Sequence, residues 1–260
     1  MANIEFDFHQ EKVLITGASR GIGYAVAEAF AKAGADLMVL ADGDDIFGAA
    51  HRLDELGRGG VHPIKCDISD PQAVARAFEQ VDRIDVLVNN AGLELMTPLA
   101  DTSPGAEAAF GRILDINVLG TYYVTRAAVQ KMANGGRIIF TASIWGRVSV
   151  AKFSAYCASK HATLGFMRSM ANELGPRGIR VNAVCPGWVR TDASMRSLQD
   201  MALDTNRDQQ DLLAEIVGNQ VLDGLMEPVD VAPPYLYLAS RAAANMTGQA
   251  LMVDRGEVMA

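Results

Sequence analysis

Short apolar runs alternate with helix-like segments along almost the whole of this chain. The apolar runs lie at 12–16, 35–42, 61–65, 84–89, 137–143, 179–185 and 247–254. Helix-like segments separate them, chiefly at 24–33, 46–56, 71–81, 104–132 and 154–174. Because parallel strands need such crossover connections, the alternation predicts a doubly wound parallel α/β sheet of about seven strands with helices on both faces. A length of 260 residues, with no linker or repeat, predicts a single domain over residues 1–260.

A glycine-rich turn, GASRGIG, follows the first apolar run. Gly17, Gly21 and Gly23 let the backbone turn tightly, so the amino end of the next helix can approach a diphosphate with its unpaired N–H groups. The spacing is GxxxGxG and differs from the GxGxxG of the commonest dinucleotide-binding fingerprint. Because glycine turns also close ordinary strand–helix units, this motif alone is a modest indication of a nucleotide site.

The second apolar run ends in an acidic residue, Asp42, nineteen residues beyond Gly23. A carboxylate at the end of the second strand accepts hydrogen bonds from an adenosine ribose and repels a 2′-phosphate, so Asp42 favours NAD over NADP. Asp44 and Asp45 add negative charge there, although they also suit the start of a helix. Arg20 in the glycine turn is the opposing indication, since a cation can bind a 2′-phosphate. We give Asp42 more weight and predict NAD.

Polar residues also follow later apolar runs, where the strand ends of a parallel sheet collect ligands. Asp67 follows the third run, and Asn89, Asn90 and Gly92 close the fourth. Two side-chain amides there can tie neighbouring loops together, and an ordinary turn is the alternative. Ser143 ends the fifth run, where its hydroxyl could either donate to a substrate oxygen or cap a turn.

Asn117 lies inside the long segment 104–132, which we expect to be mainly helical. Asparagine is a mediocre helix former, so its place in mid-helix indicates a local backbone distortion, a bound water or simple surface exposure. Surface exposure is the simplest of the three, and the residues alone leave the alternatives open.

The segment 154–174 carries the pair that bears most on chemistry. Its apolar residues recur at helical spacing and Gly175-Pro176 follows, so we expect one long helix with Tyr156 and Lys160 on the same face. A free phenol ionises near pH 10. Lowering its pKa by roughly three units needs about 4 kcal/mol, which one ammonium at roughly 4 Å supplies at an effective dielectric near 20. We therefore expect Lys160 to make Tyr156 a proton acceptor, although an isolated pair at this spacing is more often a solvated one.

Charge and composition exclude several classes of function. The net charge is −8, with 23 Lys and Arg against 31 Asp and Glu, so nothing indicates binding to nucleic acid or anionic lipid. Cys66, Cys157 and Cys185 form no CxxC spacing and the four histidines form no HExxH pattern, so we expect no disulfide and no metal site. The first residues lack a signal-peptide layout and no run of about 18 apolar residues occurs, so we expect a cytoplasmic protein.

The later loops are expected to shape a substrate pocket. The sixth apolar run leads into Pro186 and Gly187, and the loop that follows should border the reacting end of a cofactor. The segment 193–224 has weak periodicity and predicts one or two short helices on a mobile flap. The residues that we expect to contact substrate are Ser143, Glu94, Trp145, Phe153 and Trp188.

The motifs TGASRGIG, NNAG, Asn117, Ser143, YCASK and PGWVRT occur in the order typical of the short-chain dehydrogenase/reductase family, which this sequence resembles over nearly its whole length. The resemblance implies a Rossmann-type fold, a nicotinamide cofactor and a catalytic set of Asn117, Ser143, Tyr156 and Lys160. It implies cofactor contacts from Gly17, Ser19, Arg20, Gly21, Ile22, Gly23, Asp42, Asp67, Ile68, Asn89, Ala91, Gly92, Tyr156, Lys160, Pro186, Gly187, Val189 and Thr191.

Within that set the resemblance assigns individual roles. Asp67 is expected to contact the adenine, Asn89 and the NAG turn to support the cofactor, and Thr191 to meet the carboxamide. Asn117 is expected to keep a water that links Lys160 to solvent. The resemblance further implies a homotetramer, with helices near 105–131 and 154–174 at its interfaces.

The function expected from these residues is hydride transfer between NAD and a secondary alcohol such as a polyol, sugar or cyclic alcohol. Tyr156 would act as the general base while Ser143 holds the reacting oxygen. An NADP-dependent carbonyl or 3-oxoacyl reductase is the alternative among enzymes. A dinucleotide-sensing regulatory protein is the alternative outside them, although such proteins often lack part of the catalytic set that this chain keeps.

Overall fold

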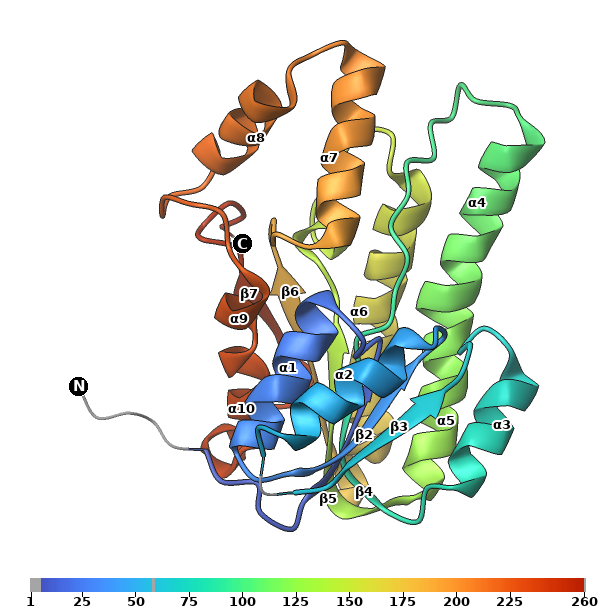
Figure 1. Ribbon diagram of the computed structural model, residues 1–260, viewed down its shortest axis with the longest axis vertical. Helices are drawn as coiled ribbons and strands as arrows, with labels where there is room; N and C mark the ends of the chain where they lie inside the picture. Colours follow the sequence, from blue (N-terminus) through green and yellow to red (C-terminus); the bar gives the residue numbers. More distant parts are fainter. Residues whose placement is uncertain (1–5, 58, 260) are drawn as a thin grey trace.

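The computed structural model describes residues 6–57 and 59–259, and these form one domain built on a seven-stranded parallel sheet (Figure 1). The strand order is β3-β2-β1-β4-β5-β6-β7, and every pairing is parallel. The strands are β1 (Lys12–Thr16), β2 (Asp36–Ala41), β3 (Val61–Lys65), β4 (Ile84–Asn89), β5 (Met132–Thr141), β6 (Arg180–Pro186) and β7 (Ala250–Val253). The predicted fold class is therefore confirmed.

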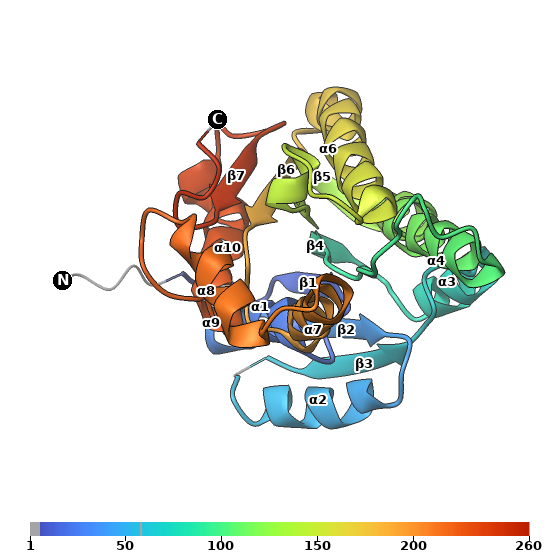
Figure 2. The ribbon, with the colours of Figure 1, turned by 90° about the horizontal axis from the view of Figure 1, so that it is seen from above.

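Helices cover both faces of this sheet (Figure 2). They are α1 (Gly21–Lys32), α2 (Asp45–Asp54), α3 (Pro71–Glu79), α4 (Pro104–Leu114), α5 (Thr121–Gln130), α6 (Ser154–Leu174), α7 (Asp192–Thr205), α8 (Gln209–Gly218), α9 (Pro228–Val231) and α10 (Pro233–Ala239). None of these helices is both long enough and apolar enough to cross a membrane.

The strands divide the apolar core into two layers. In β1, Val13 and Ile15 pack with α1, α2 and α10, whereas Leu14 packs with α3, α5 and α6 on the opposite face. This alternation follows from the period of two in a β-strand. Because both faces are covered, the central strands are apolar over most of their length, which makes them recognisable as continuous runs.

The segment 104–132, predicted as mainly helical, has two features that the sequence left open or did not predict. Residues Asp115–Gly120 form a π-helical turn between α4 and α5, so of the alternatives left open at Asn117 a local backbone distortion is the one observed. Asn117 is only 3% exposed, so the alternative of simple surface exposure is wrong. The helix ends at Gln130, and β5 begins at Met132 rather than after the glycine pair at 135–136.

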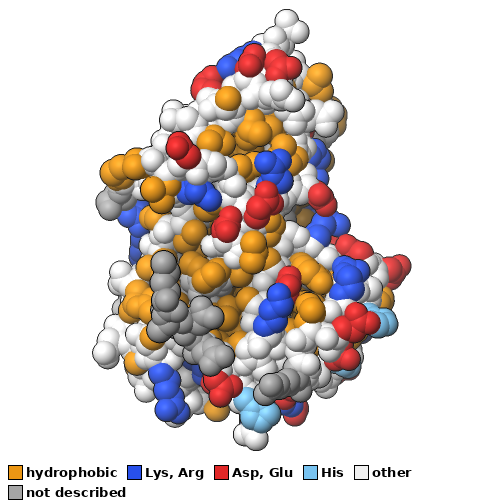
Figure 3. All heavy atoms as spheres, turned by 60° about the vertical axis from the view of Figure 1, so that its left-hand side comes forward, with side chains coloured by type: hydrophobic (Ala, Val, Ile, Leu, Met, Phe, Trp, Pro, Cys, Tyr) orange, Lys and Arg blue, Asp and Glu red, His pale blue; other side chains and the backbone are white. Residues whose placement is uncertain are grey.

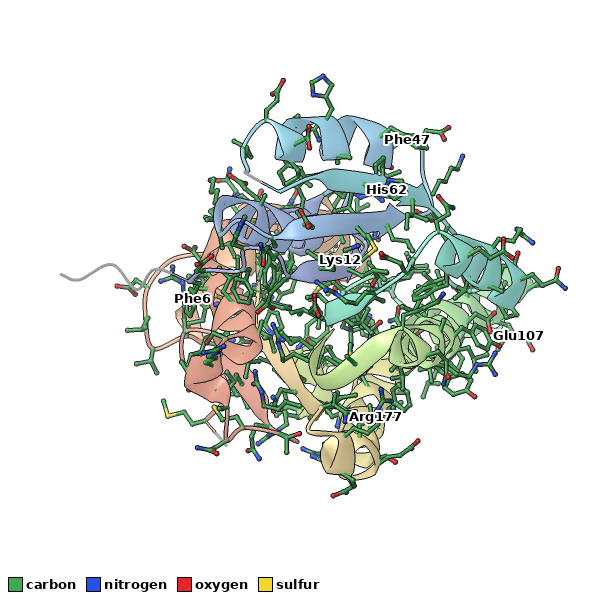
Figure 4. All side chains as sticks on the ribbon, turned by 90° about the horizontal axis from the view of Figure 1, so that it is seen from below. Phe6, Lys12, Phe47, His62, Glu107 and Arg177 are labelled. Carbon is green, nitrogen blue, oxygen red and sulfur yellow. The ribbon has the colours of Figure 1, made fainter. Side chains whose placement is uncertain are left out.

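Two helices rise above the carboxyl ends of the strands (Figure 1). These are α7 and α8, and they account for most of the predicted flap over 193–224. The opposite end of the sheet appears in Figure 4, where Lys12 is labelled at the start of β1. Lys12 pairs there with Asp82 at 2.9 Å. This ion pair lies at the amino end of β1, whereas the polar candidate residues follow its carboxyl end. The candidate functional residues therefore lie at the carboxyl ends of the strands.

Candidate active site

A long groove runs along the carboxyl ends of β1 to β4 and encloses about 1280 Å³ of space, including its open mouth. The strand order reverses direction between β1 and β4, and ligands of open parallel sheets bind in the crevice at such a point. The groove is lined by residues from the glycine turn, the end of β2, the end of β3 and the loop after β4, and it reaches Tyr156 and Lys160.

The glycine turn leaves no room for side chains. Gly17 has φ +65°, and a Cβ on it would lie 2.8 Å from the Ala91 backbone. A Cβ on Gly23 would lie 2.1 Å from the Gly17 carbonyl oxygen. Helix α1 begins directly after this turn, and no side chain caps its amino end. Its first N–H groups are therefore available to an anionic ligand such as a diphosphate, so the residues present fit a dinucleotide.

Asn90 fastens the three strands beside this turn. Its side-chain amide donates to the carbonyl oxygens of Thr16 and Gly17 at 3.1 and 3.2 Å, and its amide oxygen accepts from the Thr141 hydroxyl at 3.1 Å. The ends of β1, β4 and β5 are thereby tied together. The prediction that a side-chain amide at this strand end ties neighbouring loops together holds for Asn90, the second Asn of the NNAG motif. It does not hold for Asn89.

The far end of the groove carries opposed charges. Asp42 is exposed and lines the groove directly after β2. Arg20 also lines it, and its guanidinium lies 3.3 Å from the Asp45 carboxylate, which partly neutralises it. Asp67 binds Ser69 and pairs with Arg112 at 2.9 Å, so its carboxylate is held in place beside the groove.

A smaller pocket of about 530 Å³ adjoins the groove under α7. Its walls are mainly apolar and aromatic, with Trp145 and Trp188 at an interplanar angle of 81° and 6.0 Å between ring centres. Ser143, Glu94 and Tyr156 supply polar groups. Tyr156 and Glu94 line both cavities, so they lie where a ligand in the groove would meet one in the pocket.

Tyr156 and Lys160 lie on the same face of α6, as predicted. The Lys160 ammonium is 5.4 Å from the centre of the Tyr156 ring and donates to the Thr141 carbonyl oxygen at 2.8 Å. Lys160 is buried, and burial lowers the pKa of its ammonium to about 8, although the Glu94 and Cys185 charges act in the opposite direction. The ammonium therefore stays largely charged at neutral pH.

The pKa of Tyr156 is shifted upward, whereas the sequence predicted a downward shift. Burial raises the pKa of the phenol above its usual 10, and the Glu94 carboxylate raises it further, whereas a hydrogen bond with Ser143 lowers it. The expectation that Lys160 alone brings this pKa toward neutrality is therefore wrong for the protein by itself. Desolvation of the phenolate is the largest cause of the rise.

Glu94 is the titratable group that sequence reasoning placed in the pocket without a role. Burial raises the pKa of its carboxyl, and a hydrogen bond from Ser197 and the charges of Lys160 and Arg196 oppose that rise. Ser197 and Arg196 belong to α7, and the Arg196 guanidinium also binds the Glu94 carbonyl oxygen at 3.2 Å. The flap is thereby attached to the loop after β4.

Comparison with known proteins places this arrangement in a family. A family model described as enoyl-(acyl carrier protein) reductase matches residues 17–257. The oxidoreductase UcpA of Salmonella typhimurium is 38% identical over 256 residues, covering 95% of this chain and 94% of that protein. A short-chain type dehydrogenase/reductase from Mycobacterium marinum is 35% identical, with a TM-score of 0.86 over 98% of each chain. This chain belongs to the short-chain dehydrogenase/reductase family.

Members of the family with similar structures bind nicotinamide dinucleotides of both kinds. A 3-oxoacyl-[acyl-carrier protein] reductase from Brucella melitensis holds NAD; it is 32% identical with a TM-score of 0.84, and the match covers 97% and 92% of the two chains. The L-sorbose reductase of Gluconobacter frateurii holds NADPH and L-sorbose; it is 27% identical with a TM-score of 0.88, and the match covers 98% of each chain.

Most residues expected to contact cofactor or substrate in this family member line one of the two cavities. In the groove these are Gly17, Ser19, Arg20, Gly21, Ile22, Asp42, Asp67, Ile68, Ala91, Gly92, Glu94, Tyr156, Lys160 and Thr191. In the pocket they include Ser143, Trp145, Pro186, Gly187, Trp188 and Val189. Among the described residues, no cluster of histidine, cysteine and acidic side chains could hold a metal ion.

Four expected residues lie outside both linings. Gly23 packs under the glycine turn. Asn89 is buried and donates to the Thr125 hydroxyl at 2.9 Å, so it faces helix α5 and supports the core rather than a cofactor. Phe153 is fully buried against Trp145, with 5.1 Å between ring centres, so its place is behind the pocket wall.

The fourth of these residues, Asn117, links the loop after β4 to α6. Its amide donates to the Leu93 carbonyl oxygen and the Ser159 hydroxyl, both at 2.9 Å, and its oxygen accepts from the Leu93 N–H at 2.7 Å. The π-helical turn carries the side chain inward to make these bonds. A Cβ on Gly92 would lie 3.3 Å from the Asn117 oxygen, which is tighter than most such contacts, so this glycine helps the loop to close over Asn117.

Replacing Asn117 with alanine should therefore destabilise the fold strongly. Asn117→Ala removes the buried bond to Ser159 and leaves the part-buried N–H and carbonyl of Leu93 without this partner, and we expect a loss of about 2 kcal/mol in the free energy of unfolding in urea. The control is Asn245→Ala, at an exposed position, which should change this free energy by about 0.5 kcal/mol at most. Equal effects of the two substitutions would contradict the bridging role of Asn117.

Proposed function

We propose that this protein is an NAD-dependent oxidoreductase that transfers a hydride between NAD and a secondary alcohol such as a polyol, sugar or cyclic alcohol. The observation that carries the proposal is the position of Tyr156, which lines both the dinucleotide-sized groove and the smaller pocket beside Ser143. A proton acceptor at that junction can reach a hydroxyl whose carbon faces the groove. The nicotinamide, when bound, takes up or returns the hydride.

The residues around Tyr156 would divide the remaining work. Ser143 would donate a hydrogen bond to the reacting oxygen, a role that its position beside the phenol supports. Lys160 would hold the cofactor ribose and supply positive charge that favours the ionised phenol. Asn117 would keep a water in contact with Lys160 for proton exchange with solvent. In the reductive direction Tyr156 would return the proton to the same oxygen.

Asp42 supports NAD as the cofactor. Its exposed carboxylate follows β2 and lines the end of the groove, where it would accept hydrogen bonds from an adenosine ribose and repel a 2′-phosphate. Arg20 favours the second candidate, an NADP-dependent carbonyl or 3-oxoacyl reductase, but its guanidinium is already paired with Asp45. The Asp45 carboxylate therefore adds to the repulsion that a 2′-phosphate would meet.

The proposal includes a cytoplasmic homotetramer. Phe110, Leu119 and Tyr122 are exposed apolar side chains on α4, the π-helical turn and α5, the region expected at one interface. Figure 3 shows further apolar side chains gathered on the face that carries α9, α10 and β7, and Val229 of α9 is 65% exposed. The chain's three cysteines are free and buried, which suits a reducing compartment.

Tyr156→Phe tests the proton acceptor. Because the phenol oxygen is not needed to bind a diphosphate, we expect NAD to bind with an unchanged dissociation constant while turnover of a secondary alcohol falls at least a thousand-fold. Turnover is followed through NADH formation in a screen of alcohols. Wild-type turnover in the variant would falsify the assignment, and loss of NAD binding would point to a structural role instead.

Asp42→Ala tests the choice of cofactor. Removing the repulsive carboxylate should raise kcat/KM for NADP relative to NAD by about ten-fold or more, measured with one alcohol under fixed conditions. Asp36→Ala is the matched control, because Asp36 is the first residue of the same strand and lies at its amino end, away from the groove. This substitution should leave the ratio of kcat/KM for NADP and NAD unchanged. A wild-type preference for NADP would overturn the argument from Asp42.

A further inference from the structure

The carboxylate of Glu94 lies where the groove meets the pocket, and it has no role in the proposed mechanism. Glu94 lies on the loop after β4 and lines both cavities. Its charge acts on Tyr156 and on Lys160, so it lies near both of these side chains. Partly burying a carboxylate there costs free energy and makes the proposed base harder to ionise, which points to a function for the carboxylate itself.

Contacts within the protein use only part of this carboxylate. Ser197 of α7 lies near it, and its hydroxyl lowers the pKa of the carboxyl. Arg196 binds the backbone carbonyl of Glu94, and its contribution to the side chain is that of a nearby charge. A carboxylate has two oxygens and about four acceptor sites, so acceptor capacity remains on the side that lines the pocket. Lys160 and Arg196 balance its charge, which favours a neutral donor over a cationic one.

The rest of the pocket suits a ring of moderate size. Trp145 and Trp188 present aromatic surfaces nearly perpendicular to each other, and Ile144 and Val189 add apolar contacts. Aromatic faces pack well against the C–H faces of a saturated ring. Ser143 and Tyr156 would hold one oxygen of that ring, and Glu94 is the remaining acidic acceptor of the pocket.

We propose that Glu94 is a specificity-determining residue that accepts a hydrogen bond from a second hydroxyl of the substrate. The pocket then selects neutral ring diols, or the corresponding hydroxyketones, over ring alcohols with a single oxygen. An anionic substrate is disfavoured because its charge would face the carboxylate. This inference rests on the proposed function and names the substrate class of the same site.

Intrinsic fluorescence gives a test that does not depend on turnover. The chain has two tryptophans, and both Trp145 and Trp188 line the pocket, so their emission reports its occupancy. To prevent turnover, each protein carries Tyr156→Phe, which is expected to bind NAD without oxidising alcohols; it is saturated with NAD and titrated with trans-1,2-cyclohexanediol and with cyclohexanol. We expect the diol to bind about ten-fold more tightly or better, the size typical of a hydrogen bond to a charged acceptor. Equal binding of the two ligands, or binding of neither, would overturn the inference.

Glu94→Gln removes the charge and keeps the shape of the side chain. It should reduce the advantage of the diol to about two-fold or less while the dissociation constant of cyclohexanol stays within about two-fold of wild type. Ser197→Ala is the matched control, because it removes the α7 hydroxyl that lowers the pKa of Glu94 and leaves the carboxylate in place. We expect Ser197→Ala to keep the preference for the diol.

The two variants separate specificity from support of the flap. If Glu94 only fastens α7, Glu94→Gln and Ser197→Ala will weaken both ligands alike, and the inference fails. Turnover separates this failure from failure of the proposed function. Oxidation of cyclohexanol and the diol with equal kcat/KM would contradict the inference alone, whereas absence of NADH formation from every alcohol tested would contradict the proposed function.

Discussion

The placement of the Lys160 ammonium 5.4 Å from the Tyr156 ring, in the interior of the protein, is the interaction on which the proposed chemistry depends. Several features of the fold hold it there. The Thr141 carbonyl oxygen at the end of β5 accepts from the ammonium. Asn117 binds Ser159 on the same helix and holds the loop that contains Gly92. The distortion of the long helix at the π-helical turn thus serves to position α6.

Much of this arrangement could be predicted from sequence because a parallel sheet imposes it. Most strands are apolar runs, and the residues that follow them lie at the same end of the sheet, so Gly17, Asp42, Asp67 and Ser143 had to lie along that end. Asn89 and Phe153 show the limit of that reasoning. Asn89 is still within β4 and has the same parity as Leu87, so it faces the α5 layer, whereas Asn90 lies beyond the strand and reaches the turn. A shift of one residue exchanges the two faces.

The pKa of Tyr156 was beyond sequence reasoning for a different reason. The spacing of Tyr156 and Lys160 gave the sign of one interaction, but the depth of burial and the proximity of Glu94 come from residues far away in the chain. Both effects raise the pKa of the phenol in the protein alone. Ionisation of the phenol therefore requires positive charge beyond that of Lys160, and an oxidised nicotinamide in the adjoining groove is the ligand that would supply it. Cofactor binding and activation of the base are coupled in this account.

The pH dependence of kcat/KM for alcohol oxidation, with saturating NAD, tests this coupling most directly. The account predicts an acid limb whose midpoint lies below 10, the ordinary pKa of a phenol, because the loaded site favours the phenolate. The same midpoint should move to higher pH in Lys160→Gln, in which one of the two positive charges is absent. A wild-type midpoint above 10, or a midpoint that is the same in both proteins, would contradict the central role of the Tyr156–Lys160 pair.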